Sequence, residues 1–211
     1  MAYKAMEGTR LRILQQLQRN LNDTVEGLAS TIGLAQATIR RHLDILQRDR
    51  LVAFREVRKR TGRPEYSFYL TNGGQEALPK HYDQLLGMLV RELSVLPPDD
   101  TAKRDGQQIL ELLFLRMARR VAQTVQGELD GNDLAQRVAA LMQHLGHEDF
   151  YPDAEVVDGM LRIRLHNCPF RSVAMQNKAV CTFDLNLISS LLDVGVEREE
   201  WIHDGDRACT Y

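Results

Sequence analysis

The 211-residue sequence has no apolar run near the roughly 18 residues that a membrane-spanning helix needs, and its first residues lack a signal-peptide core. We therefore expect no membrane partner and a cytoplasmic location. Only three cysteines occur, which in a reducing compartment argues against a disulfide framework. We find no nucleophile–base pair, no glycine-rich phosphate loop and no His-x-x-x-His pair, so we do not expect an enzyme.

Charge is distributed unevenly along the chain. The formal net charge is −2, yet residues 1–80 contain 14 Lys and Arg against 8 Asp and Glu, whereas residues 81–211 contain 13 against 21. With 44% hydrophobic and 27% charged residues, the composition is that of a globular protein. A basic front half joined to an acidic back half suits a DNA-binding module followed by a domain that does not bind DNA.

The front half contains a helix-turn-helix pattern. Apolar side chains recur on one helical face of residues 24–32. The Thr24 hydroxyl can cap the first turn of this helix, and Gly33 supplies the turn that follows it. A second helix is predicted over residues 36–50, and a first helix over residues 7–20 would complete a three-helix core. The residues expected in this core are Leu11, Ile13, Leu14, Leu17, Val25, Leu28, Ile32, Ile39, Leu43 and Leu46.

The outer face of the helix over residues 36–50 combines hydrogen-bonding groups with positive charge, as contacts to DNA bases and phosphates require. The candidates for base contacts on this face are Gln36, Thr38, Arg40 and Arg41. Residues 51–57 and 65–70 are rich in β-branched and aromatic side chains and predict a hairpin. Its loop carries four cations, which favour an anionic partner over a simple solvated charge run: Arg58, Lys59, Arg60 and Arg63.

Together these elements resemble the winged-helix transcription regulators of the ArsR and DeoR type. The resemblance covers residues 7–78 and is carried by Ala37-Thr-Ile-Arg-Arg-His-Leu and Thr61-Gly-Arg-Pro. It implies double-stranded operator DNA as the partner, bound by a homodimer because an operator consists of two half-sites. A helix capped by Thr71 is expected to run through the Pro79 region. Residues 81–96 predict a further helix with a wide apolar stripe, which needs covering by a second copy or by the back half of the chain.

The back half predicts an α+β domain with a small antiparallel sheet. Two prolines and a run of charge make residues 96–106 a linker. Helices are expected over residues 107–126, 134–145 and 180–194. The alternating run over residues 155–166 predicts a half-buried strand with a hairpin turn at Asp158-Gly159 before it, and further strands are expected over residues 198–202 and 207–211. The expected division is a winged-helix domain over residues 1–80, a helix and linker over residues 81–106, and an α+β cysteine-containing sensor and dimerisation domain over residues 107–211.

All three cysteines lie in the predicted α+β domain. Twelve residues separate Cys168 from Cys181, and 27 separate Cys181 from Cys209. Cys181 is expected to open a helix, whose dipole favours a thiolate. These spacings are wider than those of a compact zinc knuckle. Three buried structural cysteines therefore stay an alternative on the residues alone.

A winged helix followed by Asn-Cys-Pro-Phe and two further cysteines at these spacings resembles the SufR-type iron–sulfur-sensing repressors over nearly the whole chain. The resemblance implies that Cys168, Cys181 and Cys209 hold an iron–sulfur cluster, either [4Fe–4S] or [2Fe–2S], and that the clustered form represses. Some members have a fourth cysteine between the last two, which this sequence lacks. The remaining position would be filled by His166, His203, a carboxylate or an external thiol.

The sequence therefore predicts a DNA-binding transcription regulator that senses cluster or redox status, with repression as the preferred mode of action. A zinc sensor or a thiol-redox sensor using the same cysteines is the first alternative. A ligand-binding or enzymatic domain fused to a winged helix is the second.

Overall fold

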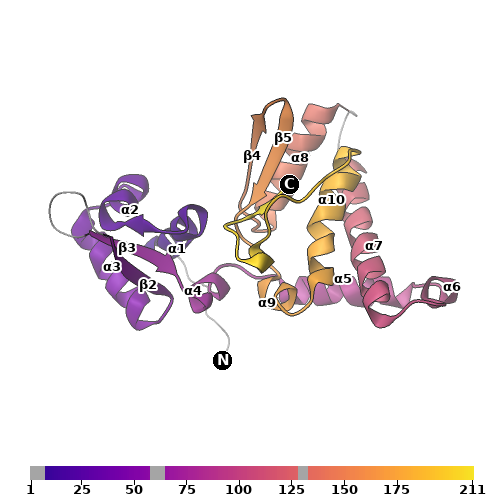
Figure 1. The fold of residues 1–211 in the computed structure, drawn as a ribbon, viewed down its shortest axis with the longest axis horizontal. Coiled ribbons are helices and arrows are strands. Elements are labelled where there is room, and N and C mark those ends of the chain that lie inside the picture. Colours follow the sequence, from indigo (N-terminus) through magenta and orange to yellow (C-terminus); the bar gives the residue numbers. More distant parts are fainter. Residues whose placement is uncertain (1–7, 58–64, 128–132) are drawn as a thin grey trace. The chain divides into compact units, whose positions relative to one another are not determined.

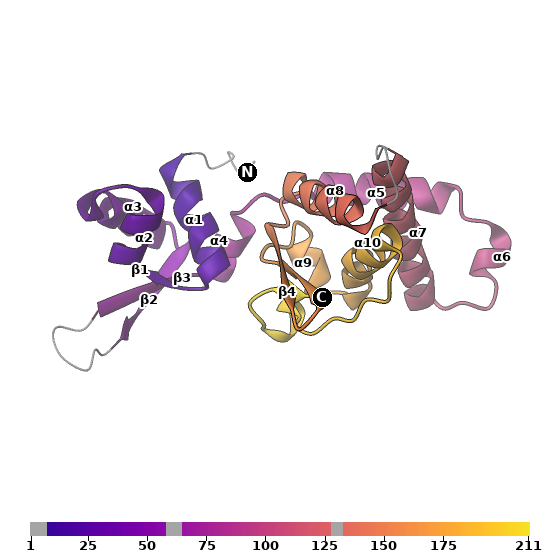
Figure 2. The ribbon, with the colours of Figure 1, turned by 90° about the horizontal axis from the view of Figure 1, so that it is seen from above.

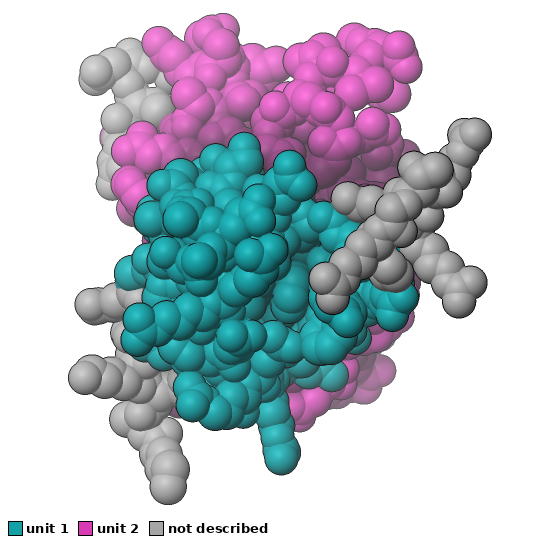
Figure 3. Space-filling model, turned by 90° about the vertical axis from the view of Figure 1, so that its left-hand side faces the viewer, with its two compact units in different colours: residues 1–79 teal, residues 80–211 magenta. Residues whose placement is uncertain are grey.

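The computed structural model describes residues 8–57, 65–127 and 133–211. The chain divides into two compact units, Met1–Pro79 and Lys80–Tyr211, which Figure 3 shows in different colours. None of the described helices combines the length and the apolar character that crossing a membrane requires.

Unit 1 consists of a helical core with a small antiparallel sheet (Figures 1 and 2). Its helices are α1 (Thr9–Asn20), α2 (Val25–Ile32), α3 (Gln36–Arg48) and α4 (Asn72–Glu76). Its strands are β1 (Asp23–Thr24), β2 (Val52–Val57) and β3 (Glu65–Leu70), paired in the order β1-β3-β2. The apolar faces of α1, α2 and α3 are buried together with side chains of β2 and β3. The predicted winged-helix fold is therefore confirmed.

Local backbone chemistry fixes the helix ends in unit 1. The Thr24 hydroxyl accepts a hydrogen bond from a backbone N–H in the first turn of α2, and Gly33 ends that helix in the left-handed conformation with φ 74°. Thr71 caps α4 by accepting from the Gly74 N–H at 3.0 Å. A Cβ at Gly74 would lie 2.0 Å from the Leu51 carbonyl oxygen, so this close approach of two backbone segments requires glycine.

Three details of unit 1 differ from the sequence prediction. The second helix of the motif ends at Arg48, and Arg50 lies in the turn to β2 with φ 59°. The helix capped by Thr71 ends at Glu76 instead of continuing past Pro79, since the residue before a proline disfavours helical backbone. Leu11 and Val25, expected in the core, are only partly buried. Four predicted DNA-binding residues lie outside the described residues: Arg58, Lys59, Arg60 and Arg63.

Unit 2 combines six α-helices and a second antiparallel sheet among its described residues. The helices are α5 (Tyr82–Ser94), α6 (Pro98–Thr101), α7 (Gly106–Gly127), α8 (Leu134–His147), α9 (Arg171–Ala174) and α10 (Thr182–Leu192). Two 3-10 helices, η1 (Lys178–Cys181) and η2 (Ile202–Asp204), accompany them. The strands are β4 (Pro152–Val157), β5 (Met160–Leu165) and β6 (Cys209–Thr210), in that order. The predicted α+β class is confirmed.

The core of unit 2 lies between its helices and one face of the sheet. Helices α7 and α10 lie side by side (Figures 1 and 2). The alternation along β5 puts Ile163 and Leu165 in this core. Asp158 and Gly159 both have positive φ, 52° and 79°, and form the tight turn between β4 and β5 that the sequence predicts.

The C-terminal part of unit 2 departs most from the sequence prediction. The expected strand over residues 198–202 is reduced to a single bridge between Glu200 and Thr210, and residues 202–204 form η2. Only Cys209–Thr210 are a strand, and their partner is β5. The helix expected from residue 180 begins at Thr182, after η1, and Gly146 lies inside α8 rather than ending it. Short strands held by two or three hydrogen bonds leave no clear period in the sequence.

Helix α5 divides its apolar stripe between the core and the surface. Leu85 is buried, and Leu89 packs against the core of unit 2. This part of the stripe is therefore covered by the back half of the chain, one of the two alternatives that the sequence left open. The opposite side of the stripe stays uncovered in the single chain and consists of Leu86 (62% exposed), Val90 (58%) and Leu93 (58%).

A buried carboxylate ties α5 to α7. Glu92 is 1% exposed and accepts hydrogen bonds from Arg116, at 3.2 Å, and from Arg120. The arginine hydrogen bonds lower the Glu92 pKa below its ordinary value of 4.5 against the opposing effect of burial, the bond from Arg120 contributing most. Arg116 also bonds Asp100 at 3.2 Å, which connects α6 to the same pair of helices.

We expect Glu92→Gln to lower the free energy of unfolding of unit 2 by about 2 kcal/mol at neutral pH, because charge-assisted hydrogen bonds are lost. The folded-state pKa is depressed, so the stabilisation is present above pH 4.5 and disappears as the pH falls through the lower, folded-state value. Chemical unfolding of both proteins at pH 7 and below pH 4 measures this. Glu111→Gln, at an exposed position of α7, is the control. If the free energies of unfolding of wild type and Glu92→Gln differed by the same amount at both pH values, the stabilising role assigned to ionised Glu92 would be contradicted.

Candidate DNA interface and candidate metal centre

The outer face of α3 is exposed as the sequence predicts. Ile39, Leu43 and Leu46 are buried, and the candidate residues for base contacts lie on the exposed side: Gln36, Thr38, Arg40 and Arg41. Arg40 donates a hydrogen bond to the Gln36 side chain at 3.3 Å, one helical turn away. Such a pair orders a guanidinium that still has free donors for a base edge or a phosphate.

Two surface grooves of unit 1 flank α3 and separate these candidates. Gln36 and Arg40 line one groove together with three carboxylates, Glu26, Asp44 and Glu65. The other groove contains the remaining two candidates and one cation from α1; its lining residues are Arg10, Ala37, Thr38, Arg41, His42 and Ile45. The Arg41 side is therefore the more positive of the two, and an anionic backbone is attracted there first.

Arg10 is a residue of this interface that the sequence analysis missed. It lies on the exposed side of α1 and lines the same groove as Thr38 and Arg41. Arg10 lies on a helix outside the helix-turn-helix pair, so no sequence motif includes it. Its polar position in the amphipathic pattern of α1 was the one sequence feature that indicated an exposed side chain.

The structure brings the three cysteines of unit 2 together. Cys168 follows β5, Cys181 ends η1 and Cys209 opens β6, and all three line one cavity of about 20 Å³. The remaining lining consists largely of apolar and aromatic side chains: Phe150, Phe170, Arg171, Ala174, Met175, Val180, Phe183, Asp184, Trp201, Ile202 and His203. Phe150, Phe170 and Phe183 pack edge to face at 6.1 and 5.9 Å between ring centroids and form one wall.

Burial keeps the three thiols protonated. It raises the pKa of all of them above the ordinary 9.0, and that of Cys209 to about 12. The expectation that the start of α10 favours a thiolate at Cys181 is therefore wrong, since desolvation outweighs the helix dipole there. Cys181 and Cys209 are buried; Cys168 keeps some exposed surface as a residue, while its sulfur is desolvated.

Each sulfur nevertheless has one nearby N–H group that favours its thiolate form. The backbone N–H of Phe170 lowers the pKa of Cys168, that of Ile202 lowers the pKa of Cys209, and the indole of Trp201 lowers the pKa of Cys181, although the indole nitrogen makes no hydrogen bond of normal geometry. In iron–sulfur proteins, N–H groups beside the ligand sulfurs adjust the reduction potential.

Cations stand beside the cavity. Arg198 stacks on the rings of Trp201 and Tyr211, at 4.6 and 5.3 Å from the ring centroids, and donates to the Cys181 carbonyl oxygen. Lys178 lies 4.5 Å from the Trp201 centroid. Their positive charge lowers the cost of thiolates at Cys181. The two cationic side chains beside the cavity therefore suit a metal group whose binding requires the buried thiols to lose their protons.

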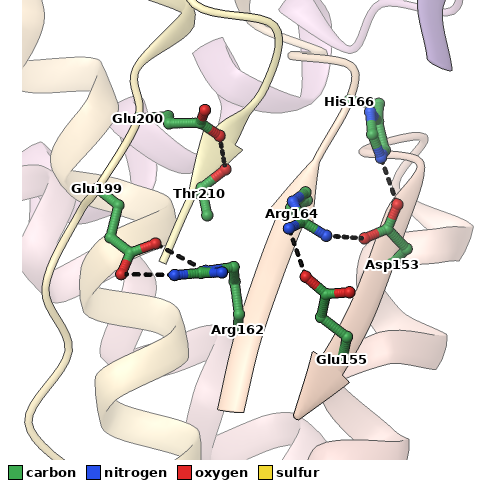
Figure 4. Close-up of polar contacts among 8 residues, drawn as sticks. All are labelled: Asp153, Glu155, Arg162, Arg164, His166, Glu199, Glu200 and Thr210. Atoms are coloured by element: carbon green, nitrogen blue, oxygen red, sulfur yellow. Dashed lines mark hydrogen bonds and ion pairs between the residues drawn. The ribbon is translucent and has the colours of Figure 1, made fainter. Parts of the chain in front are cut away.

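The two histidines considered as further ligands lie in different places. His203 lines the cavity, with its Nδ1 3.1 Å from an Asp204 carboxylate oxygen and its ring stacked on Trp201. His166 does not line the cavity. Its Nε2 pairs with Asp153 of β4, which Arg164 of β5 also contacts (Figure 4).

The donor set fits a cluster better than a single ion. Among residues 8–57, 65–127 and 133–211, no three His, Cys, Asp or Glu side chains are arranged to hold one metal ion. A structural zinc ion needs its ligands around one point. In a [4Fe–4S] cluster each thiolate binds its own iron, so the three thiols need not meet at one point. The cavity has room for about one water molecule, so the residues that line it would have to move apart before a cluster could bind.

We expect the three thiols of the metal-free protein to react slowly with iodoacetamide at pH 7.5. Alkylation requires the thiolate, and a pKa raised by one unit lowers its fraction about tenfold. Rates more than about tenfold below that of free glutathione, rising with pH beyond 9, are expected; tryptic peptides identify each site by mass. Denatured protein is the control. A cysteine that reacts as fast as glutathione would contradict the assigned burial and favour a thiol-redox sensor.

Comparison with known proteins supports the assignment of unit 1. Residues 7–53 match the family model described as bacterial regulatory protein, arsR family, a range covering α1, α2, α3 and the start of β2. A solved structure of Bacillus subtilis PadR in complex with operator DNA aligns with 89% of this chain and 99% of that chain, at 18% identity and a TM-score of 0.33, values too low to establish a shared fold. No curated protein matches the chain. The helix-turn-helix expected from the sequence is confirmed, and residues 7–53 are similar to the arsR family.

Proposed function

We propose that this chain, a transcription regulator with an ArsR-type winged helix, binds operator DNA as a homodimer and carries an iron–sulfur cluster in unit 2 that controls DNA binding. The observation that carries the proposal is that three cysteines, the only three in the sequence, come from separate elements to line one buried cavity.

Cys168, Cys181 and Cys209 are the residues that would hold the cluster. When bound, it would supply a centre whose integrity depends on iron supply and on oxidants. The chain's own contribution is to exclude water with Phe150, Phe170 and Phe183 and to place Arg198 and Lys178 beside the negative charge. Three proton releases accompany loading, because the thiols are protonated in the metal-free state.

Regulation then follows from linkage. If loading of unit 2 and DNA binding by unit 1 have a coupling free energy, cluster status changes operator affinity, and operator DNA changes cluster retention by the same factor. The proposed sign, repression by the loaded form, rests on the resemblance to the SufR-type regulators.

Anaerobic reconstitution tests the proposal. Purified protein is incubated with ferrous iron, sulfide and a thiol reductant, desalted, and assayed for iron, acid-labile sulfide and visible absorption. A brown protein with both elements, whose operator affinity differs from that of the metal-free form, is expected. A colourless protein with bound zinc would establish the zinc sensor instead. A protein that takes up neither, but forms a reversible disulfide, would establish the thiol-redox sensor.

The exposed side of α5 is the proposed dimer contact. Val90→Asp should convert the dimer to a species of the monomer mass, 24.1 kDa, at micromolar concentration, because it buries a charge in an apolar interface. Sedimentation velocity measures this. Val156→Asp, at an exposed position of β4, is the matched control. Wild-type protein that sediments as a monomer would contradict the proposed dimer, whereas a dimeric Val90→Asp would move the contact elsewhere.

A further inference from the structure

Asp184 lies at the cysteine cavity without having been assigned a role there. It sits on α10 three residues after Cys181, so both side chains project from the same side of the helix start. The residue is 8% exposed and lines the cavity together with all three cysteines. Its charge acts on each of the three thiols, which places the carboxylate within electrostatic reach of every sulfur.

The two oxygens of the Asp184 carboxylate differ in their surroundings. Oδ2 accepts a hydrogen bond from the Tyr211 hydroxyl at 2.6 Å. Oδ1 is buried and makes no hydrogen bond of normal geometry, and it forms a long ion pair with Arg198 Nη2 at 3.8 Å. A buried carboxylate oxygen with only a long ion pair is costly, and a further ligand at this atom would offset that cost.

We propose that Asp184 is the fourth protein ligand of the iron–sulfur site, binding through Oδ1 where other chains of this kind use a fourth cysteine. This inference rests on the proposed function of the cavity. Tyr211 and Arg198 fix the carboxylate so that Oδ1 keeps its direction. A carboxylate is a harder ligand than a thiolate, so the iron that it holds is the most weakly bound and the first to be lost.

His203 is the competing ligand within the cavity wall, and the geometry favours Asp184. The His203 ring already has a carboxylate partner at Nδ1 and stacks on Trp201, and its side chain is 22% exposed. Asp184 is more deeply buried than His203, and its Oδ1 lacks a hydrogen bond.

The test compares anaerobically reconstituted full-length wild type with Asp184→Asn, Asp184→Cys and His203→Ala. Asn keeps the volume and can still accept from Tyr211, so the metal-free fold should be retained; circular dichroism checks this. We expect Asp184→Asn to lose iron and sulfide to a chelator about tenfold faster than wild type. Asp184→Cys should hold them longer than Asp184→Asn, with resonance Raman bands shifted to an all-thiolate pattern. His203→Ala should match wild type.

The outcomes separate this inference from the function on which it rests. Wild type that binds no iron and sulfide overturns the proposed function, and the ligand assignment with it. Wild type that loads while Asp184→Asn keeps the same iron content, spectrum and loss rate overturns only the ligand assignment. Asp184→Cys that loses iron as fast as Asp184→Asn also overturns only the ligand assignment. Equal loss from the two variants is what a purely structural role of Asp184 predicts. If Asp184→Asn does not fold, identical Raman spectra of wild type and Asp184→Cys still exclude Asp184 as a ligand.

Discussion

Replacing any one of Cys168, Cys181 and Cys209 by serine should abolish stable binding of iron and sulfide. Three thiolates and one weaker ligand leave no spare position, so the loss of one exposes an iron to water and oxygen. We expect each variant, reconstituted anaerobically, to retain no more iron and sulfide after desalting than a protein without cysteines. Control of operator affinity by loading should disappear in all three, while unit 1 stays folded.

The pattern across the three variants distinguishes the alternatives. Structural cysteines would lower stability unequally, in proportion to local burial, and would leave iron content unchanged. A thiol-redox switch would need only two of them, which would form a disulfide on oxidation. The matched control is Ser189→Ala, a small change at a half-buried position of α10 away from the cavity lining. Cys209→Ser that retained full iron and sulfide would exclude a cluster held by all three cysteines.

Arg41→Ala should weaken specific operator binding about 10- to 100-fold and relax sequence preference, as expected for a lost contact to a base edge, which is worth about 1–3 kcal/mol. Arg41 is exposed on the outward face of α3 and lines the more positive of the two grooves, with Thr38 and Arg10. Fluorescence anisotropy with the operator and with a scrambled duplex, at several salt concentrations, measures affinity and specificity together.

Variants of other cations separate base contacts from phosphate contacts. Arg60→Ala, in the loop between β2 and β3, should weaken binding to both duplexes equally and lower the salt slope by about 1. Arg10→Ala should behave like Arg60→Ala if α1 contacts the phosphate backbone. Arg207→Ala removes the same charge from an exposed position of unit 2 and should change nothing. Equal loss on operator and scrambled DNA in Arg41→Ala would show that this residue binds phosphate only.

Unit 1 could be predicted closely because local signals agreed with the tertiary fold. The helical period, the Thr24 cap, the Gly33 turn and the β-branched strands each depend on neighbouring residues, and all are observed. The contact between Gly74 and the Leu51 carbonyl could not be predicted, because it joins two backbone segments that no sequence pattern relates.

The candidate metal centre could be predicted only in part. The sequence identified the cysteines by type and spacing, but it assigned Cys181 a favoured thiolate, since burial of a sulfur has no local signature. The sequence offered a carboxylate as a further ligand without indicating Asp184, because its contacts with Tyr211 and Arg198 join segments that no sequence pattern relates. The 3-10 segment at residues 202–204, which supplies part of the cavity wall, depends on the Asp206 side chain accepting from the Trp201 N–H at 2.8 Å, a contact without periodicity.

On the proposed function, the small size of the cysteine cavity would affect the rate of cluster uptake rather than the affinity for the cluster. A space of about 20 Å³ is smaller than a cluster, so on the proposed function entry and exit would require movement of the wall formed by Trp201, Ile202 and His203. At high donor concentration the uptake rate would then reach a ceiling equal to the opening rate, whatever the strength of the ligands. The ligands would set how much cluster is held at equilibrium, and this short segment would set how quickly the regulator registers a change in supply.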